Sequence, residues 1–263
     1  MDAASELPVI KLVNGHVEEV VDFIAVELAF ALVVNGREIV SLMCTPTDME
    51  AMAIGFLLSE GVIVGRDSLE SVTVDEKRYW VSVKLKNLPS DWSERLNKKT
   101  ITSGCGQGVT FTQAADLRGY GERRDSLCVT LTQVKQLFKQ FGPLSGLFDK
   151  TGGVHSAALA SPEEILLFCE DVGRHNAVDK LIGKAFLAGI SVQDKILLSS
   201  GRISGEIMTK VIRNRISILI TRSAPTCMSI SYGEDYGVTL IGFARGNRMN
   251  VYTHPRRVNF SGA

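Results

Sequence analysis

One cysteine, Cys105, lies in the small and polar stretch ITSGCGQGVT, where three glycines surround it. Glycine reaches backbone angles closed to other residues and lets another molecule approach the main chain, although each glycine adds conformational entropy that folding must overcome. A free cysteine usually packs in a core, but no apolar side chain lies between Ser103 and Gly108, which makes core packing a poor explanation. The stretch therefore predicts an accessible thiol on a flexible loop, with room for a large partner or substrate.

A glycine-rich phosphate loop is the alternative interpretation of this stretch, because Gly104, Gly106 and Gly108 alternate with other residues. The dinucleotide motif requires the spacing G-x-G-x-x-G after a buried strand. Here the spacing differs, and the preceding residues 93–99 are polar and basic. The accessible thiol is the better interpretation.

The composition of the 263-residue chain indicates a globular protein and excludes several classes of function. Hydrophobic residues make up 45% of the chain, and 29 basic residues balance 29 acidic ones, so the basic excess expected for non-specific nucleic-acid binding is missing. The N-terminal residues lack the features of a secretory signal, and no apolar run approaches a membrane span. We therefore expect a cytoplasmic protein without nucleic-acid or membrane partners.

The cysteines are widely spaced and odd in number, which argues against a disulfide framework. They are Cys44, Cys105, Cys128, Cys169 and Cys227. Because the sequence contains no C-x-x-C pair, a cysteine zinc site is not expected, and we predict no bound metal.

Residues 1–99 are expected to form a small α+β domain that leads into a flexible glycine and cysteine loop over residues 100–112. The turn Asn35-Gly36 predicts a hairpin of residues 23–34 with residues 37–43. The pattern Thr47-x-x-Glu50 predicts a capping box that opens a helix through Leu58. Two more strands are predicted, over residues 69–74 and 79–85.

Residues 113–263 are expected to form an α/β domain, since predicted helices and buried strands alternate. Thr130 caps an amphipathic helix that ends at Gly142-Pro143, and the small residues 152–160 predict a second helix. Further elements are predicted as strands 165–169, 195–198, 216–220, 238–243 and 249–253 and helices 176–187 and 204–214. This alternation predicts a mostly parallel sheet with helices on both faces.

Four polar, glycine-containing loops are expected at the carboxyl ends of these strands, where ligands bind in such sheets. They cover residues 150–155, 170–176, 199–204 and 221–226. Helix N-termini and guanidinium groups there suit phosphate oxygens; the arginines are Arg174, Arg202, Arg222, Arg245 and Arg248. A single arginine would be interpreted as a surface charge, but five of them predict an anionic, phosphorylated ligand. His155 and His175 fit a structural role and a catalytic role equally well, while Asp171 is expected to cap the following helix.

Seven long motifs follow one another along the chain: CTPTDMEAMAIGFLLSEG, SGCG, TGGVHSAAL, EDVGRHNAVDKLIG, SSGRISGEIMTK, SAPT and GFARGNRMNVYTH. From about Val33 to His254 this order resembles the formate dehydrogenase accessory sulfurtransferase family, FdhD. The resemblance implies a cytidine-deaminase-like three-layer α/β domain with a mostly parallel sheet, over residues 113–263, after the small α+β domain. It also implies a maturation factor that takes sulfur from a cysteine desulfurase as a persulfide. The sulfur then passes to the molybdenum or tungsten cofactor, bis(molybdopterin guanine dinucleotide), before insertion into the formate dehydrogenase apoprotein.

The resemblance assigns the persulfide to Cys105 and assigns the segment 243–248 to the transiently bound guanine dinucleotide cofactor. Together with the strand-end loops, the predicted cofactor-binding residues are Phe243, Ala244, Arg245, Gly246, Asn247, Arg248, Gly152, Gly153, His155, Gly173, Arg174, His175, Ser200, Gly201, Arg202 and Ser223. Many members of the family carry Cys-Gly-x-Cys in the loop, whereas this chain has Gly108 in the second cysteine position. Cys105 alone would then hold the persulfide, without a neighbour that could resolve it as a disulfide. The family also suggests a homodimer.

Two other functions compete with sulfur transfer. A zinc-dependent deaminase needs H-x-E followed by P-C-x-x-C. This chain has Ala157 in the glutamate position after His155, and the cysteines after Pro225 are out of register, so deaminase activity is not expected. A non-catalytic chaperone that binds the cofactor remains the alternative; it predicts that Cys105→Ala still supports maturation.

Overall fold

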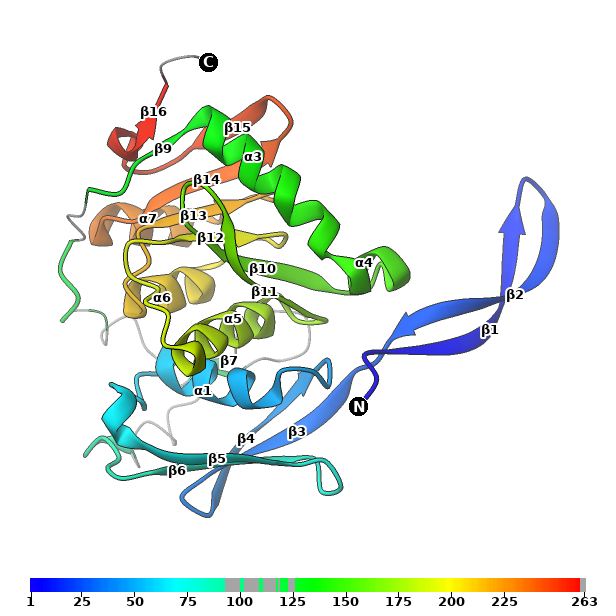
Figure 1. Cartoon of the computed structure of the whole chain (residues 1–263), viewed down its shortest axis with the longest axis horizontal. Helices are drawn as coiled ribbons and strands as arrows, with labels where there is room; N and C mark the ends of the chain where they lie inside the picture. The colour runs from blue at the N-terminus through cyan, green and yellow to red at the C-terminus, as the bar shows by residue number, and fades with distance from the viewer. Residues whose placement is uncertain (93–99, 102–108, 111–116, 118, 123–125, 261–263) are drawn as a thin grey trace.

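The computed structural model describes residues 1–92, 100–101, 109–110, 117, 119–122 and 126–260. Figure 1 shows three parts: a hairpin that projects from the molecule, a small sheet with one helix, and a larger sheet flanked by helices. Within the described residues, no helix has both the length and the apolar character needed to cross a bilayer. The flanking helices and the larger sheet position the site described below.

The larger sheet has six strands in the order β11-β10-β12-β13-β14-β15. Their bounds are β10 His155–Ala160, β11 Ile165–Asp171, β12 Ile196–Ser199, β13 Ile218–Thr221, β14 Thr239–Arg245 and β15 Arg248–Val251. The pairs β12–β13 and β13–β14 are parallel, while β10 is antiparallel to both of its neighbours and β15 is antiparallel to β14. The sheet is therefore mixed, and the expectation of a mostly parallel sheet holds only for its centre.

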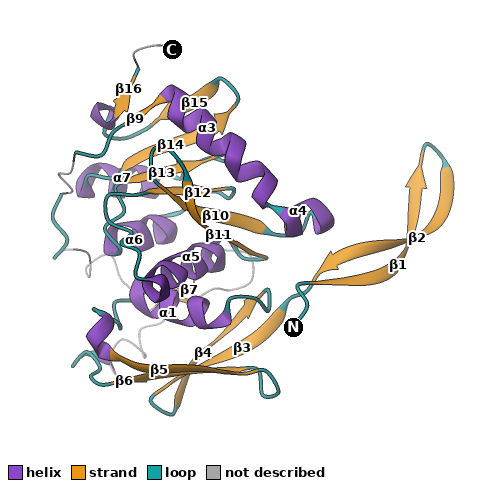
Figure 2. Ribbon diagram, in the orientation of Figure 1, coloured by secondary structure: helices purple, strands orange, loops and turns teal. Residues whose placement is uncertain are grey.

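Helices cover both faces of this sheet (Figure 2). Their bounds are α3 Leu131–Phe141, α4 Gly146–Thr151, α5 Arg174–Ala188, α6 Gly205–Arg213 and α7 Cys227–Tyr236. The apolar stripe of α3 packs on the face formed by Ile196, Leu198 and Ile220. The apolar side chains of α5 and α6 pack on the opposite face, where Leu197 and Leu219 point, because successive residues of a strand face opposite sides. The result is a three-layer α/β/α arrangement.

The predicted cap of α3 is confirmed, and the helix predicted for residues 152–160 is wrong. Thr130 and Gln133 form a capping box at the start of α3. Residues 155–160 form the strand β10, in which Ala157, Ala158 and Leu159 are fully buried. Alanine favours helix in isolation, but here it provides the small side chains that a central strand needs between helices on both faces.

The smaller sheet packs against α1 (Met49–Ser59) and has the strand order β4-β3-β6-β5. Its strands are β3 Leu28–Val34, β4 Arg37–Cys44, β5 Leu69–Asp75 and β6 Trp80–Leu85. The Asn35-Gly36 hairpin is confirmed, with both residues at positive φ. The predicted capping box at Thr47 is wrong, because the N-cap residue is Asp48, which has φ 50° and no side-chain capping bond.

The two sheets meet where α1 crosses α5 in close backbone contact. A Cβ atom on Gly55 would lie 1.8 Å from the carbonyl oxygen of Asp179, and one on Gly183 would lie 1.8 Å from that of Ala51. Only glycine at both positions allows this approach. Residues 93–99 and 102–108 lie outside the described residues, so the division into 1–99, 100–112 and 113–263 remains a prediction.

Two buried ion pairs hold α5 to its neighbours β11 and α6, and each pair is also hydrogen bonded to the smaller unit, through Thr45 or Ser59. Lys180 Nζ lies 2.7 Å from Asp171 Oδ2 and donates to the carbonyl oxygen of Thr45 at 2.8 Å. Lys210 Nζ lies 2.7 Å from Asp179 Oδ2. Buried charges are costly unless they are paired and hydrogen bonded, and both conditions hold here.

An N-terminal hairpin was not anticipated from the sequence. Strands β1 (Ala4–Val13) and β2 (His16–Ala25) pair along their whole length as a separate two-stranded sheet. The predicted strand over residues 23–34 is in fact divided between β2 and β3. The remaining short elements are η1 Arg66–Ser68, η3 Gly142–Leu144, η4 Pro255–Arg257, β7 Thr100–Ile101, β8 Val109–Thr110, β9 Val129–Thr130 and β16 Val258–Asn259.

Candidate functional site

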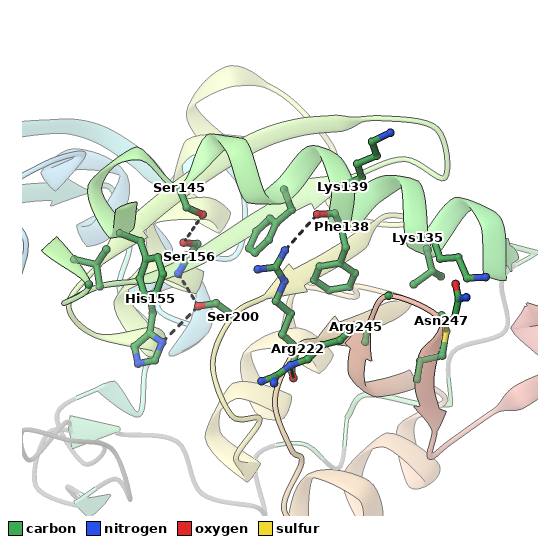
Figure 3. Close-up of a pocket in the computed structure, with 18 of the residues that line it drawn as sticks. Lys135, Phe138, Lys139, Ser145, His155, Ser156, Ser200, Arg222, Arg245 and Asn247 are labelled. Carbon is green, nitrogen blue, oxygen red and sulfur yellow. Dashed lines mark hydrogen bonds between the residues drawn. The ribbon is translucent and has the colours of Figure 1, made fainter. Parts of the chain in front are cut away.

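A pocket of about 910 Å³ lies beside the ends of the central strands (Figure 3). Its walls come from α3, the turn between α4 and β10, and the β14–β15 turn. Ser200 and Arg222 enter it directly after β12 and β13, at the carboxyl ends of two parallel strands. This is the position expected for a ligand site in an α/β sheet.

The pocket has an aromatic wall that holds one arginine in place. The guanidinium carbon of Arg222 lies 5.4 Å from the ring centroid of Phe138 and 5.7 Å from that of Phe141. Arg222 Nη2 also donates to the carbonyl oxygen of Phe138 at 3.3 Å. These contacts restrict the long side chain before any ligand binds, so less rotamer entropy is lost on binding.

Positive charge surrounds the pocket, because the charged side chains among its described lining residues are all lysine or arginine. They are Lys135, Lys139, Arg222 and Arg245. Arg245 Nε donates to the carbonyl oxygen of Arg222 at 3.3 Å, which links the β14–β15 turn to the end of β13. Lys135 lies near Asn247 in Figure 3, across the opening from His155. The combination of aromatic wall and cationic rim favours an anionic ligand with an apolar or heterocyclic part.

Hydrogen bonds connect three serines and His155 along the other side of the pocket. Ser145 Oγ lies 3.2 Å from Ser156 Oγ, and the main-chain N–H of Ser156 donates to Ser200 Oγ at 2.9 Å. Ser200 Oγ lies 3.4 Å from His155 Nδ1. Burial, followed by the positive charge of Arg174, lowers the pKa of His155 below its usual value. The ring is therefore neutral at neutral pH, and with Nδ1 facing a hydroxyl its Nε2–H can donate to a ligand.

Arg174 lies next to His155 with an unsatisfied hydrogen-bond donor. The side chain is buried, and its Nε has no hydrogen-bond partner among the described residues. A Cβ atom on Gly201 would come within 3.0 Å of the Arg174 Cβ and 3.4 Å of His155 Nδ1, so glycine leaves room for this packing. A buried, unsatisfied guanidinium donor is unfavourable unless an anion binds it.

Comparison with known proteins identifies the family of the chain and supports its fold. A family model described as the FdhD/NarQ family matches residues 25–259. The chain belongs to this family. It is 39% identical over 245 residues to a Bacillus subtilis protein named sulfur carrier protein FdhD, with 93% of this chain and 94% of that protein covered. A Staphylococcus aureus protein of the same name is 33% identical over 257 residues, covering 98% of this chain and 97% of that protein.

A solved structure has the same fold. The crystal structure of a proposed formate dehydrogenase accessory protein from Desulfotalea psychrophila has a TM-score of 0.80 to this chain. The sequence identity is 24%, and the superposition covers 98% of this chain and 100% of the other. This likeness supports the mixed α/β architecture of the FdhD/NarQ family member described above.

About half of the binding residues predicted for this FdhD/NarQ member line the pocket. Those that line it are Gly152, Gly153, His155, Ser200, Ala244, Arg245, Gly246 and Asn247. Those that are not among its lining residues are Gly173, Arg174, His175, Gly201, Arg202, Ser223, Phe243 and Arg248. The two groups are neighbours, since Arg174 and Gly201 pack beside His155. Cys105 lies outside the described residues, so its predicted role stays a prediction.

Two predicted residues of the 243–248 segment point to each other instead of lining the pocket. Phe243 has φ 53° at an irregularity between β14 and β15, and its main-chain N–H donates to the carbonyl oxygen of Ser223 at 3.0 Å. The guanidinium carbon of Arg248 lies 5.7 Å from the Phe243 ring centroid. Arg245 and Asn247, which lie between them in the sequence, do line the pocket.

His175 belongs to a different environment from His155. Its Nε2 lies 3.3 Å from Ser204 Oγ and 3.8 Å from Glu206 Oε2, at the start of α6. Burial is the largest effect on its pKa and lowers it, while the hydrogen bond to Glu206 acts in the opposite direction. His175 therefore fits the structural interpretation better than the catalytic one.

The contribution of α3 was missed in the sequence. Lys135, Phe138, Lys139 and Phe141 received no role in the site, although all four line the pocket. The available signal was the spacing of the two lysines, which places them one turn apart beside the apolar stripe. Nothing in the sequence alone indicated that this side of α3 would lie opposite the β14–β15 turn.

The described cysteines fall into two classes. Cys44 and Cys169 are buried, and desolvation raises the pKa of each thiol to about 12. Cys128 and Cys227 are exposed. Within the part of the chain that the structure describes, no group of three or more histidine, cysteine, aspartate or glutamate side chains is placed to hold a metal ion.

Proposed function

We propose that this chain is a sulfur carrier for the maturation of formate dehydrogenase. It accepts sulfur from a cysteine desulfurase as a persulfide on Cys105 and transfers it to the molybdenum cofactor, which is bound transiently as a substrate. The observation that carries the proposal is the family match over residues 25–259, together with the name sulfur carrier protein FdhD that relatives up to 39% identical bear. The non-catalytic cofactor chaperone is the alternative that the experiments below distinguish.

The pocket supports a phosphorylated heterocycle as the bound part of the cofactor. Its volume of about 910 Å³ is at the upper end of the range for small-molecule sites, about 300–1,000 Å³. Lys135, Arg222 and Arg245 supply cationic donors for phosphate oxygens, and the exposed ring of Phe148 supplies an apolar surface for a base. A guanine nucleotide portion of the cofactor combines both chemistries.

The burial of the cysteines supports the assignment of the carrier thiol. Persulfide formation requires a thiolate that a desulfurase can reach, and Cys44 and Cys169 meet neither requirement. Cys105 combines a lack of bulky neighbours in the sequence with a place in the motif shared with the family. The exposed Cys227 provides the matched comparison, since it is accessible but lies outside that motif.

Intact-protein and peptide mass spectrometry tests the carrier role after incubation with a cysteine desulfurase and cysteine. We expect one added sulfur on Cys105, removable by reductant, in the wild type and in Cys227→Ser, and none in Cys105→Ser. Sulfur on Cys128 or Cys227 in place of Cys105 would overturn the assignment. Full formate dehydrogenase activity in cells that carry only Cys105→Ala would instead establish the chaperone alternative.

Calorimetric titration with guanosine diphosphate tests the pocket separately from the thiol. Arg245→Ala removes a cation that lines the pocket, and Arg248→Ala removes an exposed arginine of the same hairpin that does not. A hydrogen bond to a charged group contributes about 1.5–3 kcal/mol, which corresponds to roughly 10–100-fold in Kd. We expect a loss of that size for Arg245→Ala and less than about 3-fold for Arg248→Ala. Equal losses in the two variants would place the nucleotide elsewhere.

A further inference from the structure

The N-terminus of α5 carries positive charge at the end of a helix that favours negative charge. Its first two residues are Arg174 and His175, and its first turn contains no acidic residue. The N-cap residue is Gly173, which has no side chain to accept from the N–H groups of that turn. The positive end of the helix dipole therefore adds to the charge of the guanidinium group instead of offsetting it. An anion at this end of α5 would stabilise the helix.

Arg174 is buried there with an unsatisfied donor. The residue is 7% exposed, and its Nε has no hydrogen-bond partner among the described residues. Arginine is almost never buried unless it is paired, because its long side chain normally keeps the guanidinium group in water. The burial of an unpaired donor costs free energy that a bound anion would recover.

Arg174 and His155 approach the same point of the backbone, at Gly201. A Cβ atom on Gly201 would lie 3.0 Å from the Arg174 Cβ, 3.1 Å from its Cδ and 3.4 Å from His155 Nδ1. Ser200 Oγ lies 3.4 Å from the same His155 nitrogen (Figure 3). Because the main-chain N–H of Ser156 already donates to Ser200 Oγ, the Ser200 hydroxyl donates to Nδ1 and leaves the proton of the imidazole on Nε2. The glycine thus allows a guanidinium group and an N–H donor to lie side by side.

The carboxylate of the same turn is already engaged by other donors. Asp171 Oδ1 accepts from the main-chain N–H of Gly173 at 2.8 Å and from Asn176 Nδ2 at 2.9 Å. Asp171 Oδ2 lies 2.7 Å from Lys180 Nζ. Arg174 consequently keeps its positive charge without a carboxylate partner, and that charge contributes, after burial, to the lowered pKa of His155.

We propose that Arg174, His155 and the N-terminus of α5 form a binding site for a small dianionic oxyanion. Molybdate, sulfate and the terminal phosphate of a nucleotide share this chemistry. A guanidinium group can bind two oxygens of such an ion, and helix N–H groups can bind a third. His155 and Ser200 also line the pocket, whereas Arg174 and Gly201 are not among its described lining residues, so the site adjoins the pocket and has a cation of its own. The proposal does not depend on sulfur transfer by Cys105.

Calorimetric titration of the full chain with sodium molybdate tests the site. The buffer contains no phosphate, and chloride keeps the ionic strength constant so that screening is equal throughout. We expect one molybdate per chain, and a Kd that is about 10–100-fold higher in Arg174→Gln, which loses a charge-assisted hydrogen bond. Arg215→Gln is the matched control: Arg215 is exposed and precedes β13, while Gly201 follows the parallel strand β12, so the two lie at opposite ends of the sheet. Equal affinities in the two variants, or a wild type that does not bind molybdate, would overturn the proposal.

Nuclear magnetic resonance of the unsubstituted chain reports on the donor itself. The Nε–H signal of Arg174 is identified by its absence from the spectrum of Arg174→Lys, and it should shift when molybdate is added. A signal that stays unchanged at saturating molybdate would refute the proposal whether or not the variants fold. Gly201→Ala should weaken molybdate binding by at least about 10-fold, because its methyl group displaces Arg174 or His155, while Gly146→Ala should bind like the wild type.

A titration of molybdate in the presence of saturating guanosine diphosphate distinguishes the two sources of the anion. If the site takes the terminal phosphate of a ligand in the pocket, the nucleotide should raise the apparent Kd for molybdate by at least about 10-fold. If the site takes a free oxyanion, the Kd should stay the same. Either result supports an anion site at Arg174. None of these measurements involves the thiol, so their failure would leave the sulfur carrier role standing, and the absence of sulfur on Cys105 would leave the anion site standing.

Discussion

The close crossing of α1 and α5 gives the sharpest prediction of this structure. Gly183→Ala adds one methyl group whose ideal position lies 1.8 Å from the carbonyl oxygen of Ala51 and 2.8 Å from the main-chain nitrogen of Gly55. Backbone atoms cannot rotate away as side chains do. The two helices must therefore separate by more than 1 Å, since an ordinary contact between these atoms is about 3.4 Å or longer.

Three contributions determine how much Gly183→Ala lowers the free energy of unfolding. Overpacking of a buried site costs about 1–3 kcal/mol and occasionally more, and an overlap with backbone belongs at the upper end. Separation also stretches the bond between Ser59 Oγ and Asp179 Oδ1, now 2.8 Å. In the opposite direction, alanine stabilises a helix by about 1 kcal/mol relative to glycine. We expect a net loss of about 2–4 kcal/mol in the free energy of unfolding, or roughly 4–16 °C in Tm for a chain of this size.

Chemical denaturation of a four-variant set measures this loss. Gly55→Ala should cost a similar amount, and the double variant should cost clearly less than the sum, because helices already separated accommodate the second methyl group. Gly146→Ala in α4 is the control, since its Cβ would meet nothing within 4 Å and its stability should rise or stay level. Losses below about 0.5 kcal/mol, or strictly additive losses, would refute the described helix contact.

Three further predictions concern buried groups. Asp171→Asn should lower the free energy of unfolding by about 3–5 kcal/mol, because it leaves the buried Lys180 ammonium without its carboxylate. Guanidinium titration measures this loss, and a loss below about 1 kcal/mol would contradict the pairing. Burial holds the pKa of His175 below that of an unfolded histidine, which is about 6.5. The contribution of His175 to stability should therefore be complete above about pH 6.5 and should fall as the pH drops toward the folded pKa. A His175→Asn variant should show a flatter dependence of stability on pH between about pH 5 and 7, and equal slopes in the two proteins would contradict this prediction. In native protein at pH 7.5, Cys169 should resist iodoacetamide while Cys227 reacts, and peptide mapping that finds both alkylated would contradict the burial of Cys169.

Local patterns predicted α1, α3, α5, α6 and most strands of the two larger sheets, because their signals are contained within short segments. The α3 stripe and its cap at Thr130 are examples, as is the Asn35-Gly36 turn. The helices α4 and α7 and the N-terminal hairpin were not predicted. The error at β10 has a different origin. Its alanines have a local preference for helix, and only the strands on both sides and the helices on both faces favour a strand there. Such information is distributed over elements far apart in the sequence.

The site was predictable to the extent that it follows from topology. Strand ends of a parallel sheet converge, so the loops with Ser200 and Arg222 were expected to meet, and they do. The opposite wall could not be inferred, because it depends on which face α3 covers and on how far the β14–β15 turn reaches. Topology alone also predicts residues that do not belong to the site. Arg202 follows β12, but it is exposed and does not line the pocket.

The arrangement of charge in the molecule connects the pocket with the N-terminal hairpin of β1 and β2. Four cations converge on the pocket without a carboxylate among its described lining residues, and such a concentration of like charge opposes folding unless counter-charge is supplied. A phosphorylated ligand supplies it inside the pocket. Outside it, the N-terminal hairpin begins next to Gly153, and the net charge of −4 on residues 1–25, with five acidic side chains and one basic one, reduces the positive potential near the opening.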